Sequence, residues 1–167
     1  MLALKMIAFS AFVGIPFTMA ELKFLTPSTK FRCIRCTRCC SLDVMLSDRE
    51  IRRLGSSADR GWRTTKKSFR GRRLVCSLLE GDACTIYKER PTLCRTFPFI
   101  AVPESEFLET GFQVDPEAIR VSPSGTEAYV IIYDPECPGI GEGEPPDPQE
   151  ILDLTIRHLH EMSEKNR

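Results

Sequence analysis

A chain of 167 residues with 42% hydrophobic content is long enough for one ordinary domain with a modest core and too short for two comfortable ones. Its 23 basic and 23 acidic residues cancel, so the net charge points to neither nucleic acid nor a membrane as a partner. Eight cysteines are a high content for this length, yet they fall short of the density that marks small disulfide scaffolds. The high cysteine content therefore has to be explained from the positions of the cysteines along the chain.

The first twenty residues bear on the cellular compartment. After Lys5, an uncharged and mostly apolar stretch runs over residues 6–20. This stretch is too short to span a bilayer comfortably and resembles the apolar region of a secretory signal. Alternatively, Met19 opens an ordinary cytosolic start, and residues 1–18 are a misassigned extension of the reading frame. The segment by itself favours neither interpretation.

A run of four cysteines follows, CIRCTRCC at residues 33–40, with thiols at Cys33, Cys36, Cys39 and Cys40. The four are so crowded that few could reach separate disulfide partners. The C-x-x-C-x-x-C spacing suits a metal, because two thiolates three residues apart bind one ion and three resemble the opening of a ferredoxin run. We therefore favour a metal or cluster over disulfides or free buried thiols. A metal centre favours a reducing compartment, and hence a cytoplasmic protein starting at Met19, with export as the alternative.

A short helix is predicted directly after the run. Ser47 is the candidate N-cap, Glu50 occupies the reciprocal capping position, and Gly55 acts as a stop. Ile51 and Leu54 would share the apolar face of this helix.

Charge is distributed unevenly along the chain. Residues 49–73 carry ten basic residues against two acidic ones, a net charge of +8, whereas residues 103–153 carry thirteen acidic residues against one arginine, a net charge of −12. With Trp62 and Phe69 between its charges, the basic block could hold RNA, DNA or an anionic cofactor. The simpler interpretation is a solvated loop, or pairing with the acidic half of the same molecule.

The remaining cysteines lie in three later segments. Two β-favouring runs, residues 74–79 and 83–87, predict a hairpin with Cys76 on one strand and Cys84 on the other. A short helix bounded by Pro91 and Pro98 would present Cys94 one turn after its start. Cys137 lies in a loop rich in proline and glycine, where the backbone can wrap closely around a centre.

The C-terminal part is predicted to be scaffold. Residues 128–134 form a buried strand candidate, and Asp147 with Pro148 begins a helix over residues 147–167. Two histidines, His158 and His160, are about 200° apart on that helix, so they cannot bind one ion, and we expect both at the surface. The predicted apolar face of the helix consists of Ile151, Leu152, Thr155, Ile156, Leu159 and Met162.

Three motifs in order carry a family resemblance: the run from Cys33 to Cys40, CTIYKERPTLCRTFP from Cys84 to Pro98, and CPGIG from Cys137. Over roughly residues 31–143 the chain resembles the CxxCxxCC family of zinc- or iron-chelating proteins. The resemblance implies a small cytoplasmic cysteine-cluster domain. One branch, the flagellin lysine N-methylases, combines such a cluster with S-adenosylmethionine; we do not expect that activity to transfer, because the chain has no extra region to match their larger size. Residues at the family's positions are Tyr87, Arg90, Pro91, Cys94, Arg95, Phe97 and Pro98.

Thiolates serve zinc and iron–sulfur centres alike. We favour an iron–sulfur cluster of the 4Fe-4S type over zinc, because the first run supplies three or four thiols at once and Cys137 precedes a proline as the last ferredoxin ligand does. Eight thiols allow two centres, or one centre with structural thiols beside it. The candidate ligands are Cys33, Cys36, Cys39, Cys40, Cys76, Cys84, Cys94 and Cys137.

Four arginines lie next to these candidate ligands. Arg35 and Arg38 would stabilise an anionic centre and tune its potential, or they are solvated surface residues. The resemblance places Arg90 and Arg95 beside Cys94, in a structural or cofactor-supporting role.

Together these patterns predict a small α+β domain over residues 19–146, with short strands, short helices and a site built from loops, on which the C-terminal helix packs. The predicted function is metal binding through cysteine thiolates, with a structural or redox role. The alternative is a cluster-dependent enzyme, methyltransferase-like or redox, that acts on an unidentified substrate. No nucleophile elbow or phosphate loop indicates catalytic residues.

Overall fold

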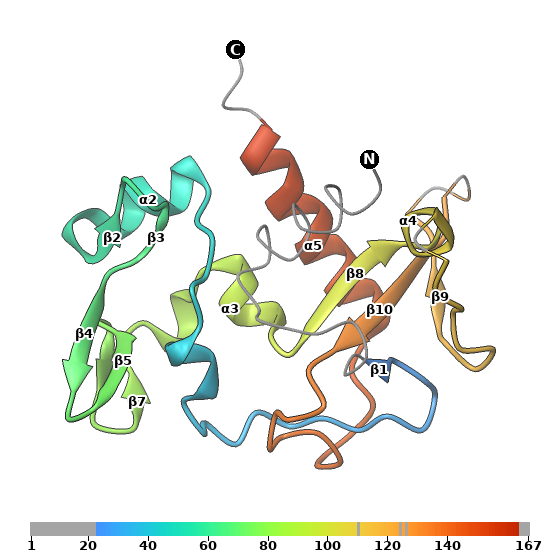
Figure 1. Cartoon of the computed structure of the whole chain (residues 1–167), viewed down its shortest axis with the longest axis horizontal. Coiled ribbons are helices and arrows are strands. Elements are labelled where there is room, and N and C mark those ends of the chain that lie inside the picture. Colours follow the sequence, from blue (N-terminus) through green and yellow to red (C-terminus); the bar gives the residue numbers. More distant parts are fainter. Residues whose placement is uncertain (1–22, 110, 124, 126, 164–167) are drawn as a thin grey trace.

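The computed structural model describes residues 23–109, 111–123, 125 and 127–163, so the segment 1–18 lies outside the described residues. The chain is a mixed α+β domain with short antiparallel strands, short helices and a longer C-terminal helix, which confirms the predicted fold class (Figure 1). Within the described residues, no helix combines the length and the apolar character needed to cross a membrane.

The main antiparallel sheet is built around β10 (Tyr129–Tyr133). One edge of β10 pairs with β8 (Phe99–Pro103), and the two ends of its other edge pair with β1 (Lys23–Phe24) and β9 (Arg120–Val121). The sequences YVIIY and FIAVP are apolar without alternation, a pattern typical of strands covered on both faces. The buried strand predicted at residues 128–134 is confirmed.

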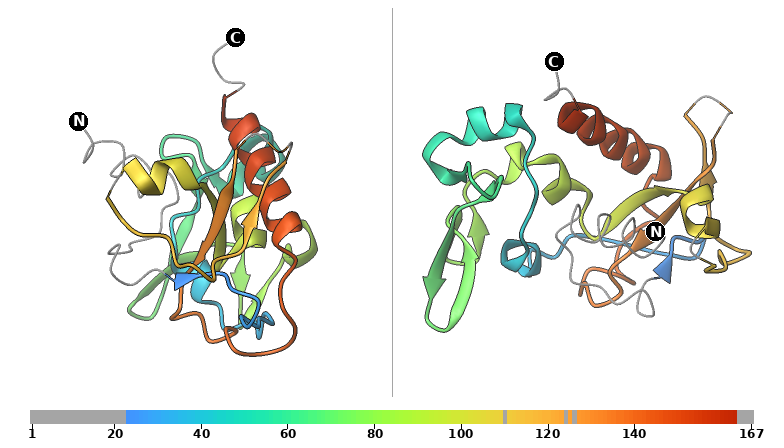
Figure 2. Two further views of the ribbon diagram at one scale, coloured as in Figure 1. Left: turned by 90° about the vertical axis from the view of Figure 1, so that its right-hand side faces the viewer. Right: turned by 45° about the horizontal axis from the view of Figure 1, so that its top comes forward.

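Helices cover both faces of this sheet (Figure 2). On one face, α5 (Pro148–Ser163) packs Ile151 and Leu152 against the strands. On the other face, α4 (Glu104–Glu109) contributes Phe107, whose ring lies 5.4 Å from that of Phe24. The strand residues of the first face are Phe99, Ala101 and Ile131, and those of the second are Ile100, Val102, Val130 and Ile132.

The helix α5 begins as predicted but buries a different face. Asp147 caps it, since its carboxylate accepts a hydrogen bond from the Gln149 N–H at 2.8 Å. His158 is buried with 1% exposure, so the expected surface position is wrong for this residue and confirmed for His160. His158 is buried because α5 packs against α2 and α3 in addition to the sheet. The buried face of the helix is therefore wider than the apolar face that the sequence predicted. Leu159 of the predicted face is 36% exposed.

A second, smaller layer holds the helix predicted after the cysteine run. This helix, α2 (Asp48–Leu54), has the full capping box of Ser47 and Glu50 and ends at Gly55 with φ +55°, so the prediction is confirmed. Its core is small, consisting of Leu46, Ile51 and Ala58. The strands of this layer are β2 (Ala58–Asp59), β3 (Thr64–Thr65), β4 (Lys67–Arg70), β5 (Arg73–Cys76), β6 (Leu79–Glu80) and β7 (Ala83–Cys84), paired as three two-stranded ribbons.

The prediction that Cys76 and Cys84 lie on the two paired strands of one hairpin is wrong. Cys84 lies opposite Leu79 in the β6–β7 ribbon, but Cys76 lies opposite Lys67 in the β4–β5 ribbon. Two tight hairpins share the segment because Gly71 and Gly81 both adopt positive φ, each allowing a short turn. The two thiols therefore reach the site from separate ribbons.

Candidate metal centre

All eight cysteines line a single cavity, which holds about 900 Å³ of space between protein atoms, open solvent included. They come from separate parts of the fold, and all are free thiols. Cys33 and Cys36 lie in the loop after β1, Cys39 and Cys40 in the 3₁₀ turn η2 (Arg38–Ser41), Cys76 on β5, Cys84 on β7, Cys94 on α3 (Thr92–Thr96), and Cys137 in the loop after β10.

The cysteine run turns sharply because of two residues between its thiols. Arg35 and Thr37 have φ of +57° and +63°, the left-handed region that non-glycine residues rarely occupy. The Thr37 carbonyl also accepts a hydrogen bond from the Cys40 N–H at 2.9 Å, which closes the η2 turn. The backbone strain is concentrated where the chain bends its thiols toward the cavity, as is common at functional sites.

Backbone contacts hold the start of this run against the Cys137 loop. The Arg32 N–H donates to the Gly139 carbonyl at 3.1 Å, and the Phe31 N–H donates to the Glu144 carbonyl at 3.0 Å. The approach is so close that a Cβ on Gly139 would lie 2.5 Å from the Arg32 carbonyl oxygen. The Pro- and Gly-rich composition after Cys137 is therefore explained by backbone approaching backbone, which brings Cys33 and Cys137 to the same cavity.

Arg38 ties the run to the same loop through its side chain. Its Nε donates to the carboxylate of Asp134 at 3.0 Å, and a second guanidinium nitrogen donates to Glu136. Asp134 is almost fully buried and its carbonyl accepts from the Cys137 N–H at 3.2 Å. The predicted arginine near the cluster thus positions the Cys137 loop, and its side chain is outside the residues that line the cavity.

The wall that carries Cys76 is fixed by Lys67, its cross-strand neighbour. The Lys67 ammonium group donates to the carbonyl of Leu42 and lies 3.5 Å from the Asp43 carboxylate. Leu42 directly follows η2, so this contact joins the β4–β5 ribbon to the cysteine run. Cys84 is positioned separately, by the β6–β7 ribbon and the hydrogen bond from the Thr85 N–H to the Leu78 carbonyl at 2.9 Å.

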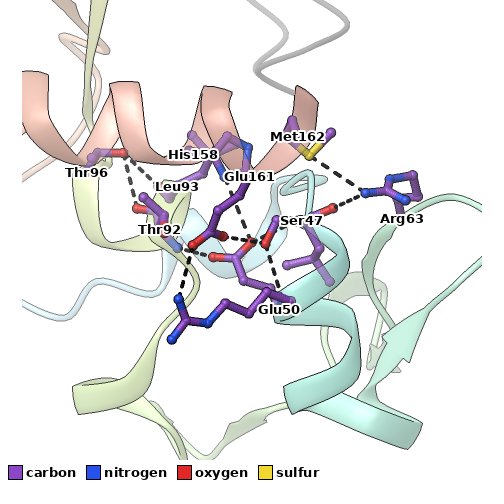
Figure 3. A network of polar contacts seen from close by, with 11 residues as sticks. Ser47, Glu50, Arg63, Thr92, Leu93, Thr96, His158, Glu161 and Met162 are labelled. Atoms are coloured by element: carbon purple, nitrogen blue, oxygen red, sulfur yellow. Dashed lines mark hydrogen bonds and ion pairs between the residues drawn. The ribbon is translucent and has the colours of Figure 1, made fainter. Parts of the chain in front are cut away.

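The helix that carries Cys94 is held by a buried carboxylate (Figure 3). Glu50 accepts from the Ser47 N–H at 2.9 Å with one oxygen and from the Thr92 N–H, at the first residue of α3, at 2.6 Å with the other. The His158 Nδ1 of α5 lies 3.9 Å from the same carboxylate, and Ser47 donates to Glu161 at 2.7 Å. One capping carboxylate therefore joins α2, α3 and α5 behind the thiols.

Electrostatic influence divides the thiols into two groups. A five-thiol group consists of Cys39, Cys40, Cys76, Cys84 and Cys94: the pKa of Cys94 is raised by burial first and then by the charges of Cys39, Cys76 and Cys84. Likewise, burial and then Cys76 and Cys39 raise the pKa of Cys84. The Cys39 thiol is hydrogen-bonded to Cys40, which raises the pKa of Cys39 and lowers that of Cys40.

The second group is a three-thiol group of Cys33, Cys36 and Cys137. Burial raises the pKa of Cys137 to about 11, and the charges of Cys36 and Cys33 act in the same direction. The cysteine run is therefore split between its second and third thiols. Burial is the largest cause of the raised pKa values of Cys84, Cys94 and Cys137, and a bound metal ion would favour the deprotonated form of each thiol.

The other predicted arginines have different surroundings. Arg35 and Arg90 lie on the ring of Tyr87, with their guanidinium carbons 4.6 and 4.0 Å from its centroid, and all three residues line the cavity. The Arg90 charge lowers the pKa values of Cys39, Cys84 and Cys94, against the larger effects that raise them. Arg95 is exposed and outside the cavity lining, so proximity in sequence to Cys94 does not bring it to the site.

Donor chemistry and donor geometry bear differently on a metal. The donor set is eight thiols, which suits zinc or iron–sulfur centres and excludes the oxygen-rich environment that calcium or magnesium prefers. Among the residues that the structure describes, no three or more His, Cys, Asp or Glu side chains are arranged to hold a single metal ion. The thiols thus fit the chemistry of a soft metal centre and share its cavity without converging on one ion position.

Sequence reasoning missed three contributors to this site. Tyr87 stands out in the sequence only as a family position, although its phenol hydrogen-bonds Cys33, an interaction that raises the pKa of the phenol. Glu50 stands out only as a cap, because nothing in the sequence indicates that a capping carboxylate also reaches Thr92. Asp134 carries no signal beyond its place three residues before Cys137.

No curated protein and no solved structure matches the chain. A family model described as "CxxCxxCC: Putative zinc- or iron-chelating domain" matches residues 32–138. The matched range includes all eight cysteines, the three ribbons and α3, and it ends one residue after Cys137. Because the match spans well over half of the 167 residues, the chain belongs to the CxxCxxCC family.

Proposed function

We propose that this protein holds an iron–sulfur cluster through the five-thiol group, with zinc as the alternative metal. The observation that carries the proposal is that Cys39, Cys40, Cys76, Cys84 and Cys94 come from four different elements and influence one another across one cavity. Four ligands from these five thiols would complete a 4Fe-4S site, and Arg90 supplies the compensating positive charge.

Zinc is disfavoured by how the C-x-x-C repeats divide. A zinc knuckle places both cysteines of one C-x-x-C on the same ion. Here Cys36 and Cys39, the second repeat of the run, belong to different groups. Only Cys33 and Cys36 remain together, beside Cys137, so this three-thiol group is the more zinc-like position.

The role we propose for the centre is structural in the first place. Two-stranded ribbons are marginally stable by themselves, and the layer of residues 42–84 has three such ribbons and a hydrophobic cluster of only three buried residues. Thiolate bonds from η2, β5, β7 and α3 to one centre would fasten this layer to the main sheet, so that metal binding and folding are coupled. When bound, a cluster also supplies one-electron redox chemistry, and the exposed Cys33 and Cys36 leave the cavity partly open to a redox partner.

Anaerobic purification followed by iron, sulfide and zinc analysis, with an absorption spectrum, tests the identity of the centre. We expect iron and acid-labile sulfide in equal amounts and charge-transfer absorption in the visible range. Stoichiometric zinc with sulfide near zero would reject the cluster.

Serine substitutions test the grouping. Cys76→Ser, Cys84→Ser and Cys94→Ser should each lose most of the iron and sulfide, whereas Cys33→Ser, a matched substitution in the same cavity, should retain them.

Hydrogen exchange on the protein before and after chelation tests the structural role. Loss of protection in residues 42–84 with protection retained in β8 and β10 is expected, and equal protection with and without metal would contradict it.

A further inference from the structure

The charge asymmetry of the sequence persists in the folded protein. In Figures 1 and 2, the basic block of residues 49–73 forms one edge of the molecule, with α2 and the β2–β5 strands, while α4, β9 and the acidic segments around them lie at the other side of α5 and the main sheet. The ion pairs of the block run to its own neighbourhood and to α5: Arg63 to Asp48, Lys67 to Asp43 and Arg49 to Glu161. The described block is therefore not neutralised by the acidic segment.

Two turns on this edge each display an aromatic side chain beside an arginine. Trp62 is 81% exposed in the turn between β2 and β3, next to the exposed Arg60. Phe69 is 76% exposed near the tip of the β4–β5 ribbon, opposite Leu74 and close to the exposed Arg72. Large aromatic side chains are seldom left this exposed, so two of them on one basic edge call for a partner.

Hydrogen bonds within the protein hold both turns in place. One Asp59 carboxylate oxygen accepts from the Gly61 and Trp62 N–H groups, at 3.0 and 3.1 Å, which fixes the first turn. The ribbon that carries Phe69 is anchored by Arg70, which donates to the carbonyls of Leu79 and Gly81, and by Arg73, which donates to the Ser41 hydroxyl at 3.2 Å. Preorganised aromatic groups lose little entropy on binding.

Cationic side chains without an internal partner lie in and between the two turns. Within the described part of the chain, the side chains of Arg60, Lys66 and Arg72 are exposed and have no hydrogen-bond or ion-pair partner. Six residues separate Trp62 from Phe69 along the chain, so their Cα atoms are at most roughly 25 Å apart. Aromatic groups in both turns, with cations beside and between them, match a single-stranded nucleic acid, whose bases stack on aromatic rings and whose phosphates bind cations.

We propose that this edge, from Trp62 through Lys66 to Phe69 with Arg60 and Arg72, binds single-stranded nucleic acid without base-specific contacts. A duplex is disfavoured because its bases are already stacked. An anionic membrane would also attract the arginines, but the two aromatic groups are separated by polar residues and form no continuous apolar face that could enter a bilayer. The surface is distinct from the thiol cavity, so the inference does not rest on the identity of the metal.

Trp62 is the single tryptophan of the chain, so its fluorescence reports directly on stacking. Titration of the purified, metal-containing protein with a 12-nucleotide oligo(U) RNA should quench this fluorescence, and anisotropy of the labelled RNA should give the affinity. Trp62→Ala and Phe69→Ala should each weaken binding roughly five- to a hundredfold. Phe112→Ala, which removes a 42% exposed phenylalanine elsewhere, is the matched control and should not change it.

Salt dependence tests the charges separately. Combining Arg60→Ala with Arg72→Ala should reduce the slope of log affinity against log salt by about 0.7 for each phosphate that the protein no longer neutralises. Arg157→Ala, an exposed arginine on α5, serves as the control. Circular dichroism and metal content should be unchanged in all variants, because every substituted side chain is exposed.

Four outcomes would overturn the proposal. These are unchanged Trp62 fluorescence at saturating RNA, equal affinity for a 12-base-pair duplex, binding to phosphatidylserine vesicles with no RNA binding, and concentration-dependent self-association that the same variants abolish. The last two would assign the edge to a membrane or to the acidic surface of a second copy.

Discussion

The carboxylate of Glu50 accepts a hydrogen bond from the Thr92 N–H at 2.6 Å, across 42 residues of sequence. The same side chain caps its own helix, α2, through Ser47. It therefore sets the position of α3, the helix that brings Cys94 to the thiol cavity. A residue with a purely local role in sequence is, in the fold, a link between the smaller layer and the site.

Glu50→Gln should destabilise the protein and weaken its hold on metal. A glutamine has one acceptor oxygen for two N–H donors, so one buried donor loses its partner at a cost of about 1–3 kcal/mol in the free energy of unfolding. Denaturant unfolding and the rate of metal loss to a chelator measure the two effects. Glu150→Gln, an exposed carboxylate in the first turn of α5, is the control. If the variant loses metal as slowly as the wild type does, Glu50 has no role in holding the metal site.

Arg38→Gln should release the Cys137 loop. Asp134 is 1% exposed and would lose a charged partner, so we expect a loss of about 1.5–3 kcal/mol, reduced because the Arg38 side chain itself is 38% exposed. Arg32→Gln provides the comparison, since its ion pair with Glu142 is exposed on both sides and should contribute less than about 0.5 kcal/mol. Chemical denaturation of both variants decides; equal effects would argue against a role for Asp134 as the anchor.

Gly139→Ala should disturb the contact between the Cys137 loop and the start of the cysteine run. An added Cβ would meet the Arg32 carbonyl oxygen at 2.5 Å, and such overpacking costs about 1–3 kcal/mol. Gly61→Ala is a suitable control, because its added Cβ would meet only the Asp59 carboxylate at 3.4 Å, an ordinary contact. Faster alkylation of Cys33 and Cys137 in Gly139→Ala than in the wild type is the expected signal. Unchanged thiol reactivity and stability would show that the loop can shift without affecting the site.

The stability of the protein should fall in mild acid in part because of His158. Burial lowers its pKa below the usual 6.5, although the charges of Glu50 and Glu161 oppose this, and Arg63 adds to the lowering. The unfolded chain thus binds a proton at this histidine more readily than the folded chain does. The contribution of the neutral His158 to the free energy of unfolding is therefore fully present above about pH 6.5 and is lost as the pH falls toward the folded-state pKa.

His158→Gln tests this pH dependence. Between pH 7.5 and 5.5, the wild type should lose more free energy of unfolding than the variant, by at most about 1.4 kcal/mol per pH unit below 6.5. His160→Gln, on the exposed face of α5, should behave as the wild type does. If both variants follow the wild-type pH profile, His158 is not the group that titrates.

The α+β class, the capping box of α2, the strand at β10 and the start of α5 could all be predicted from the sequence. Each depends on contacts within a few residues or on a run of apolar side chains. These are local properties of the sequence and do not depend on the tertiary fold. The eight cysteines are recognisable for the same reason, because thiol spacing in the run and around Cys84, Cys94 and Cys137 is itself a local pattern.

The tertiary structure alone decided which thiols become neighbours. The run is split between Cys36 and Cys39 because η2 turns toward β5 and α3, while the preceding loop is held by the Cys137 loop. Cys76 is separated from the ribbon of Cys84 by a second turn, and His158 is buried because α5 covers two layers. In each case the outcome depends on packing between segments far apart in sequence, and spacing along the chain carries no information about it.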